Sequence, residues 1–136
     1  MNIFSSELML IIIPNFILWG MLLILPPVAV KVKTILGMRN ARGLSFLNLI
    51  FITEDSIGRG EGYVNMVLKH EYTHLTQQRI FSPLGLAVIL LFHYLWLFIR
   101  HRNLQAVYEH SFIERWANRK MYYPAPAPKE IIRMNF

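Results

Sequence analysis

The segment His70-Glu71-Tyr72-Thr73-His74 places the strongest constraint on what this chain can fold into. Positions four apart lie on one face of an α-helix, so a helix here lets both imidazoles bind one metal ion while Glu71 points at the water beside it. At this chain's composition, roughly 0.01 such HExxH patterns arise by chance. The pattern therefore predicts a metal-binding helix. The alternative is a helix whose two histidines only pack or face solvent.

The residues around this pattern favour a helix over residues 63–80. Neither proline nor glycine occurs between Tyr63 and Ile80, and Gly60 and Gly62 lie just before this segment. Its apolar residues recur at helical spacing and predict buried faces. They are Val64, Met66, Val67, Leu68 and Leu75.

The segment before this helix is expected to contain a strand and a loop. Leu44 to Thr53 is rich in β-branched and aromatic residues with partial alternation, which favours a strand. Residues 54–62 are polar and glycine-rich, which favours a loop, and residues 31–43 are interpreted as a basic connector. An edge strand beside a metal site binds a peptide backbone by strand addition. A core strand without that role is the alternative, and both stay open here.

The composition indicates a membrane protein. Hydrophobic residues make up 54% of the 136 residues and charged residues only 16%, which is too apolar for an ordinary soluble domain. The run Leu8–Val30 carries no charge and is long enough to cross about 30 Å of hydrocarbon, and its prolines predict a helix that is kinked or that ends near Pro26. A basic cluster follows, made up of Lys31, Lys33, Arg39 and Arg42. By the positive-inside rule we expect a single-pass protein with the rest of the chain on the cytoplasmic side.

A second apolar stretch, Phe81–Ile99, has the hydropathy of a transmembrane helix. Counted from Gly85, it reaches only about 22 Å as a helix, short of the roughly 30 Å hydrocarbon core. A crossing here would also separate any downstream metal ligand from the two motif histidines. We therefore expect a buried, interfacial or re-entrant helix. His93 within it is expected to pack and not to bind metal.

A catalytic zinc site needs a third protein ligand and leaves the fourth position to water. The chain has no cysteine, so carboxylates and the remaining histidines are the candidates. Gln77 and Gln78, one turn after the motif, are poor zinc ligands. Another helix is expected over residues 103–122. Its candidate ligands are Glu109, His110 and Glu114.

The combination of HEYTH with Glu114-Arg-Trp-Ala-Asn118, forty residues after the second histidine, resembles the gluzincin-type zinc metallopeptidases. Their second motif is a helix carrying Glu, often followed after two residues by Ala and Asp. The chain looks most like the minigluzincin-type single domains and membrane-associated relatives with an ExxAD motif, which here reads ExxAN. The resemblance covers roughly residues 44–121 and depends on the first motif far more than on the second.

This resemblance implies a zinc-dependent endopeptidase with one Zn²⁺ per chain. The ligands would be His70, His74 and Glu114. Glu71 would be the catalytic base that takes a proton from water and returns it to the leaving amine. Asn118 falls where the family has an Asp that accepts a hydrogen bond from a ligand imidazole; Asn lacks that charge, so lower zinc affinity or activity is expected. Tyr108, His110, Arg115, Tyr122 and Tyr123 are available as oxyanion donors, and none is singled out.

We expect an α+β, mainly helical fold. A transmembrane segment (residues 1–30) precedes a minimal zincin-like domain (31–123) built from a short strand, the HExxH helix, a hydrophobic helix and the third-ligand helix. A proline-rich tail (124–136) is expected as a tether, with a segment lying across the cleft as the alternative. The net charge of +6 comes from scattered basic residues, which favours a lipid membrane over nucleic acid as a partner. The other expected partner is a peptide or protein substrate.

Two further functions stay open. One is a catalytically silent membrane scaffold of the same fold that keeps the metal for structure. The other is a small basic pore-forming or lysis-type membrane protein, in which Phe81–Ile99 crosses the bilayer and HEYTH is accidental.

Overall fold

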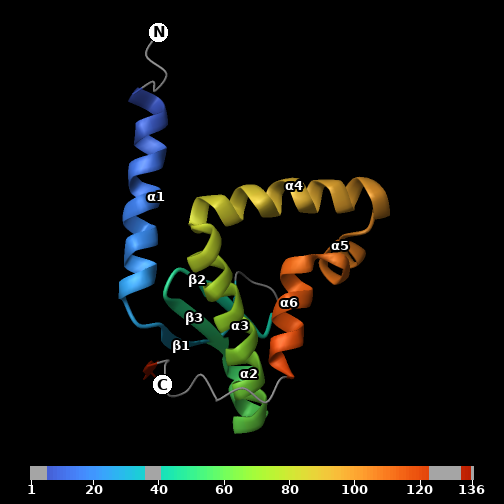
Figure 1. Cartoon of the computed structure of the whole chain (residues 1–136). Coiled ribbons are helices and arrows are strands. Elements are labelled where there is room, and N and C mark those ends of the chain that lie inside the picture. Colours follow the sequence, from blue (N-terminus) through green and yellow to red (C-terminus); the bar gives the residue numbers. More distant parts are fainter. Residues whose placement is uncertain (1–5, 36–40, 123–132, 136) are drawn as a thin grey trace.

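The computed structural model describes residues 6–35, 41–122 and 133–135. Helices dominate, and a small four-stranded sheet packs against them, so the expected α+β, mainly helical class is confirmed (Figure 1). In chain order the elements are α1 (Ser6–Ile24), β1 (Val28–Val32), β2 (Gly43–Phe46), β3 (Leu49–Thr53), α2 (Glu54–Gly58), α3 (Glu61–Phe81), α4 (Pro83–His101), α5 (Leu104–His110), α6 (Phe112–Met121) and β4 (Arg133–Asn135).

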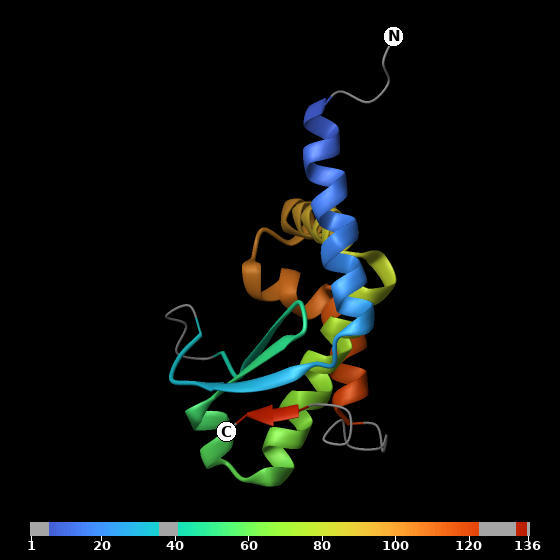
Figure 2. The ribbon, with the colours of Figure 1, turned by 90° about the vertical axis from the view of Figure 1, so that its left-hand side faces the viewer.

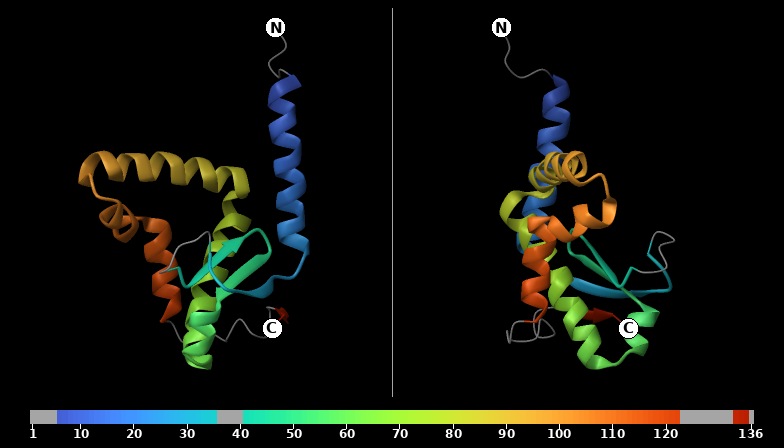
Figure 3. Two further views of the ribbon diagram at one scale, coloured as in Figure 1. Left: turned by 180° about the vertical axis from the view of Figure 1, so that it is seen from behind. Right: turned by 90° about the vertical axis from the view of Figure 1, so that its right-hand side faces the viewer.

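The sheet has the strand order β2-β3-β1-β4 and covers one side of α3 (Figure 2). Strand β1 pairs in parallel with β3 and with β4, whereas β2 and β3 form an antiparallel pair. The core lies between the sheet and α3. Its fully or nearly fully buried residues are Leu22, Ala29, Ile50, Ile52, Val64, Leu68 and Leu75. Helix α6 packs on another side of α3, so α3 is the central element of the fold (Figure 3).

The single strand expected over Leu44–Thr53 is instead a hairpin of β2 and β3. The two strands turn at Leu47 and Asn48, where Leu47 has a φ of 53°, a left-handed value that is unfavourable for a leucine. The Leu47 backbone N–H donates to Oε1 of Gln78 on α3 at 3.1 Å, which holds this turn in place. The apolar sequence of the segment has no Gly or Pro to mark the turn, so the expectation of one strand was wrong.

The apolar run Leu8–Val30 does not form one helix. Helix α1 ends at Ile24, just before Pro26 and Pro27, and β1 begins at Val28. The apolar helical part, Leu8–Ile24, is about 25 Å long and falls short of a clear transmembrane helix. The structure therefore does not clearly show the N-terminal transmembrane segment expected over residues 1–30, and the last residues of that segment belong to the sheet.

Helix α4 is longer than the sequence analysis expected. It starts at Pro83, where the Ser82 hydroxyl accepts from the Gly85 N–H, and it continues through Arg100 to His101. Its 19 residues span about 28 Å. Within the described ranges it is the one helix long and apolar enough to cross a membrane, so the length argument against a crossing was wrong. The topological argument remains, because α4 and α5 connect α3 to α6, which packs back against α3 (Figure 1).

Three other expectations are refined by the structure. The motif helix expected over residues 63–80 is confirmed as α3. The loop expected over 54–62 contains the short helix α2, whose first turn is capped by the Thr53 hydroxyl. The helix expected over 103–122 is two helices, α5 and α6, separated at Ser111, which has an extended backbone with a ψ of 126°. This break lets α6 turn toward α3.

The end of the proline-rich tail joins the sheet. Strand β4 pairs with β1, on the opposite edge of the sheet from β2. Residues 123–132 and 136 lie outside the described part, and so does the expectation that a tail segment either tethers the domain or lies across its cleft.

Candidate metal centre

The side chains of His70, His74 and Glu114 converge between α3 and α6. The two Nε2 atoms of the histidines are 3.1 Å apart. Nε2 of His70 lies 3.5 Å from Oε2 of Glu114, and Nε2 of His74 lies 3.6 Å from Oε1 of the same carboxylate. The three residues expected to be metal ligands therefore occupy one place in the fold, although Glu114 is forty residues away in sequence.

Local packing explains why the carboxylate meets the imidazoles. On α6, Ile113, Ala117 and Met121 are buried at intervals of four residues and form the face that packs on α3. Glu114 follows Ile113 directly and lies at the border of this face, only 9% exposed. The break at Ser111 sets the direction of α6, so the position of Glu114 depends on it.

The charges of the three residues support one another. Burial alone would raise the pKa of Glu114, but the adjacent His70 and His74 imidazoles outweigh it and hold this pKa at about 2. Burial also acts to lower the pKa of His74, yet the neighbouring Glu114 and Glu71 carboxylates raise it above its ordinary value. The carboxylates of Glu71 and Glu114 thus favour a positive charge at this site, either a protonated imidazole or a bound cation.

The geometry fits a single divalent cation. Ligand atoms about 2.0–2.1 Å from one tetrahedral ion are about 3.3 Å from each other, close to the separations found here. Oε2 of Glu114 is buried and has no hydrogen-bond partner among the described residues, as expected for an oxygen that faces a cation. Two imidazoles and one carboxylate form a ligand set that zinc and related metals accept. The group could therefore hold a metal ion.

Gln77 orients His74, one of the candidate ligands, and this role was not predicted from the sequence. Its Oε1 lies 2.8 Å from Nδ1 of His74, which makes a hydrogen bond when Nδ1 carries the proton and leaves Nε2 free for a metal. The Gln77 Nε2 atom donates to the Ile113 carbonyl at 3.0 Å, so the fully buried amide is fixed at both ends. The signal in the sequence was its spacing, three residues after His74 on the same helix.

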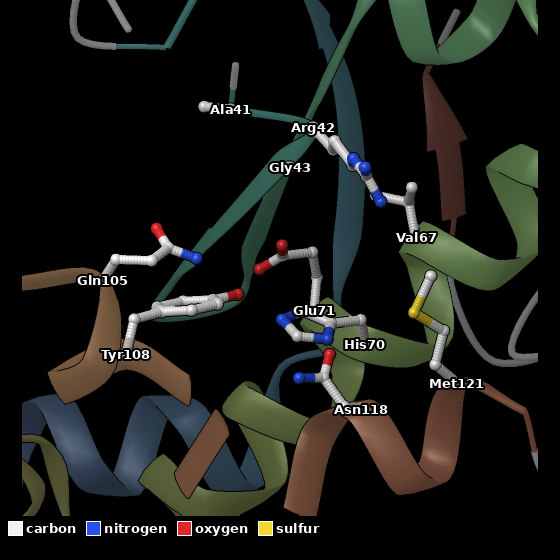
Figure 4. Close-up of a pocket in the computed structure, with 10 residues that line it drawn as sticks. All are labelled: Ala41, Arg42, Gly43, Val67, His70, Glu71, Gln105, Tyr108, Asn118 and Met121. Atoms are coloured by element: carbon white, nitrogen blue, oxygen red, sulfur yellow. The ribbon is translucent and has the colours of Figure 1, made fainter. Parts of the chain in front are cut away.

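Asn118 lies beside His70 in the wall of the cavity next to the site (Figure 4). No hydrogen bond between Asn118 and either ligand imidazole is found within the described part of the chain. The orienting role expected for Asn118 therefore stays a prediction, whereas the hydrogen bond to a ligand histidine that the structure does contain comes from Gln77.

Glu71 lines a cavity of about 790 Å³, and its carboxylate points away from the His70 ring into this cavity (Figure 4). It is 6% exposed, and its burial raises the pKa of its carboxyl group. The hydroxyl of Tyr108 and the amide of Gln105 face this carboxylate across the cavity (Figure 4). Burial and the charge of Glu114 raise the pKa of Tyr108, so its hydroxyl stays protonated.

Strand β2 passes close to Glu71. A Cβ atom on Gly43 would come within 2.8 Å of Oε1 of Glu71 and of a methyl carbon of Val67, so only glycine allows this approach. Ser45, two residues further on the same strand, lies beside Glu71 in the wall of a second, smaller cavity and acts to lower the pKa of the Glu71 carboxyl group. Strand β2, which is an edge strand of the sheet as far as the structure describes it, thus runs beside Glu71, and this smaller cavity of about 270 Å³ lies between the strand and α4.

The other candidate ligands do not join the group. Nδ1 of His110 lies 2.9 Å from the Ala106 carbonyl, and its ring stacks on that of His101. Glu109 accepts from the Gln105 amide at 2.8 Å on the surface. His93 accepts from the Phe112 N–H at 3.4 Å and packs edge-on against the Phe112 ring, in keeping with the packing role expected for it.

Comparisons with protein-family models, with curated proteins and with solved structures find no match to this chain.

Proposed function

We propose that the protein is a membrane-attached, zinc-dependent endopeptidase of the gluzincin type. One observation carries this proposal. The imidazoles of His70 and His74 on α3 and the Glu114 carboxylate on α6 lie 3.1–3.6 Å apart, as the ligand atoms of one metal ion do. Glu71, which lies between the two histidines in the sequence, faces the adjoining cavity. A metal beside a buried carboxylate and an open cavity is the arrangement that hydrolytic chemistry needs.

The proposed cofactor is one Zn²⁺ per chain, held by His70, His74 and Glu114. When bound, zinc lowers the pKa of water toward neutrality and polarises a peptide carbonyl. The ligand set without cysteine is that of catalytic zinc sites that leave one position open. Gln77 holds the His74 ring in the orientation that presents Nε2.

Glu71 is the proposed general base. Its carboxylate takes a proton from the attacking water and later gives it to the amine of the departing peptide. The absence of a side chain at Gly43 leaves room for this carboxylate, and Ser45 lies beside it. Tyr108 is the proposed donor to the oxyanion that forms at the attacked carbonyl, because its protonated hydroxyl faces the same space.

The edge of β2 is the proposed site for the substrate backbone. Among the described residues no strand pairs with β2 on the side away from β3, and both cavities are lined by Gly43 of this strand and by Glu71. An extended peptide that pairs with β2 would pass the base and the metal ligands with its carbonyl groups in line.

Helix α1 is the proposed membrane attachment, with the metal centre on the cytoplasmic side. Lys31, Lys33 and Arg42 follow α1 on the side of the domain, all exposed, and the cytoplasmic leaflet is anionic. A crossing by α4 is incompatible with this site, because α3 and α6 on either side of it supply ligands to the same metal. The pore-forming alternative requires such a crossing and is therefore not favoured.

A silent scaffold that keeps the metal for structure is the second candidate. Asn118 in place of the family's Asp favours it, since an imidazole without a charged partner binds zinc less tightly. The experiment that separates the two uses protein purified in detergent and loaded with zinc. Peptide mixtures are incubated with it and analysed by mass spectrometry, before and after a chelator and again after zinc is restored. Cleavage that is lost with the chelator and regained with zinc supports the peptidase. A zinc-loaded protein that cleaves no peptide supports the scaffold.

A further inference from the structure

Helix α4 has an apolar face that nothing in the described structure covers. Its underside packs on the domain through Leu86 and Leu97, whereas the opposite face is exposed along the whole helix. The exposed residues follow helical spacing as one stripe, each between 38% and 67% exposed, and no charged residue interrupts it. They are Leu84, Val88, Leu91, Phe92, Leu95, Trp96, Phe98 and Ile99.

Helix α1 fixes the direction in which this stripe faces. Oδ1 of Asn15 accepts from the Leu84 N–H at 2.9 Å, and the Trp19 indole donates to the Arg79 carbonyl at 2.7 Å. These bonds join the middle of α1 to the corner between α3 and α4. From there α4 runs crosswise to α1, and the first half of α1 extends beyond α4 on the side away from the metal centre (Figures 1 and 2). Leu8, Met9, Leu10, Ile11 and Ile13 in that half of α1 are also apolar and exposed.

The charges at the end of the stripe fit an anionic lipid surface. Arg100 lies over the Trp96 ring, with its guanidinium carbon 5.5 Å from the ring centre, and Arg102 follows, exposed. Trp and Arg at one end of an apolar helix are typical of the boundary between headgroups and acyl chains. The chain as a whole carries a net charge of +6.

We infer that α4 lies in the plane of an anionic membrane surface and holds the metal centre against it, and that the substrates are peptide segments at that surface. The occupant of the apolar stripe is therefore lipid. In-plane amphipathic helices bury their apolar face about 5–10 Å into the headgroup and acyl boundary. The substrate class depends on the proposed peptidase function, whereas the membrane position of α4 does not.

The depth of α1 follows from this arrangement. Asn15 is near the middle of α1 and level with the start of α4, so an α1 that crossed the bilayer from Leu8 to Ile24 would put α4 and Ser82 at mid-membrane. With α4 at the surface, the apolar turns Leu8–Pro14 reach about 10 Å into the bilayer, less than the depth of one leaflet. Over its described length α1 then enters the bilayer without crossing it, which replaces the crossing expected from sequence.

The metal centre lies close to the membrane in this position. His74 precedes Ser82 by eight residues, about 12 Å along α3, which places it at or just outside the headgroup layer. The underside of α4 supplies Leu86, Leu90 and Tyr94 to the smaller cavity beside the site. A peptide bound along β2 would thus lie directly beneath the membrane-bound helix, as the juxtamembrane segment of a membrane protein does.

Spin labels test the position of α4 without reference to activity. The chain has no native cysteine, so single cysteines replace Leu84, Leu91 and Ile99, and Asp55→Cys on α2 serves as the control. In vesicles of phosphatidylcholine and phosphatidylglycerol, all three α4 labels should be accessible to oxygen and lie at similar shallow depths, with the α2 label in water. A deep Leu91 label between two shallow ends would indicate a crossing. Labels shielded from both oxygen and water would indicate a protein partner or a second copy. Either result overturns the inference.

A peptide assay tests the substrate class. The same peptide is offered free or joined to a lipid anchor in these vesicles, and we expect the anchored form to be cleaved at least about tenfold faster. Leu91→Asp with Leu95→Asp should remove this preference while the rate on free peptide in detergent changes less than about twofold; the double alanine variant should show part of the effect. Equal rates on both forms by the wild type overturn the substrate class. Failure to cleave either form contradicts the peptidase function and leaves the spin-label result standing.

Discussion

Nδ1 of His74 lies 2.8 Å from Oε1 of Gln77, one turn further along α3. The other end of the Gln77 amide is held by the Ile113 carbonyl on α6. One buried side chain therefore connects a ligand on α3 to the helix that carries Glu114, and it couples metal binding to the packing of these two helices.

Replacing Gln77 by Ala should weaken metal binding about 10–100-fold, because the His74 ring loses the acceptor that fixes its orientation. Gln77→Glu, which keeps an acceptor, should retain most of the affinity. Zinc affinity is measured by competition with a chromophoric chelator. Gln78→Ala is the matched control, since Gln78 accepts from the Leu47 N–H instead, and equal losses in both variants would rule out the orienting role.

Glu71→Gln should keep the metal and lower the rate of peptide cleavage about 10²–10⁴-fold, because the amide does not accept the proton from water. Zinc content and the cleavage rate are measured on the same preparation. Glu54→Gln, an exposed substitution on α2, should change neither quantity. A Glu71→Gln protein that cleaves at the wild-type rate would exclude Glu71 as the base.

Gly43→Ala should reduce cleavage while metal binding changes little. The added Cβ comes within 2.8 Å of the Glu71 carboxylate and of Val67, so β2 or the Glu71 side chain must move. Gly62→Ala on α3 adds the same atom into open space and serves as the control for cleavage and thermal stability. Full activity in Gly43→Ala would show that the close approach of β2 is not required.

The metal-free protein should be more stable at about pH 5 than at about pH 8. The raised pKa of His74 gives stability that is present below 6.5 and lost as the pH rises through the folded-state pKa. The raised pKa of Glu71 likewise gives stability that is present below 4.5 and is lost as the pH rises through the folded-state pKa of Glu71. The pKa of Glu114, lowered to about 2, contributes stability above 4.5 that is lost only as the pH falls toward 2.

With zinc bound, the protein should instead be more stable at about pH 8 than at about pH 5. Zinc binds only deprotonated imidazoles, so it stabilises the fold more at the higher pH. The measurement is the thermal midpoint at both pH values, with a chelator and with zinc. His74→Ala should lose the reversal. A zinc-loaded wild type that remains less stable at the higher pH would contradict a site made of these histidines.

The HExxH helix could be predicted from sequence because its determinants are local: an uninterrupted apolar pattern and two histidines one turn apart. Glu114 was predicted only with the help of a family resemblance. The break at Ser111 that positions Glu114 has no Gly or Pro to mark it, and its position depends on the packing of α6 against α3. The role of Gln77 was missed because a glutamine was weighed only as a ligand and not as an acceptor for one.

The secondary structure that was predicted incorrectly from the sequence depends on tertiary contacts. The turn at Leu47 requires a left-handed leucine, which is held by Gln78 from a distant helix. The apolar run Leu8–Val30 was expected as a membrane segment whose helix ends near Pro26, and α1 does end at Ile24, but the sequence did not predict that the residues after Pro27 form a strand in which Ala29 is fully buried. Hydropathy predicts that such residues are removed from water. It does not predict whether they are buried in a sheet or in lipid, because tertiary contacts determine this.

The most direct measurement of the central claim is X-ray absorption at the zinc edge, combined with metal analysis of the purified protein. We predict one zinc per chain with nitrogen and oxygen neighbours at about 2.0–2.1 Å and the scattering of two imidazoles. The metal should be lost in both His74→Ala and Glu114→Ala. A protein that binds no stoichiometric metal, or that keeps it with the same surroundings after Glu114 is replaced, would contradict a cation held jointly by α3 and α6.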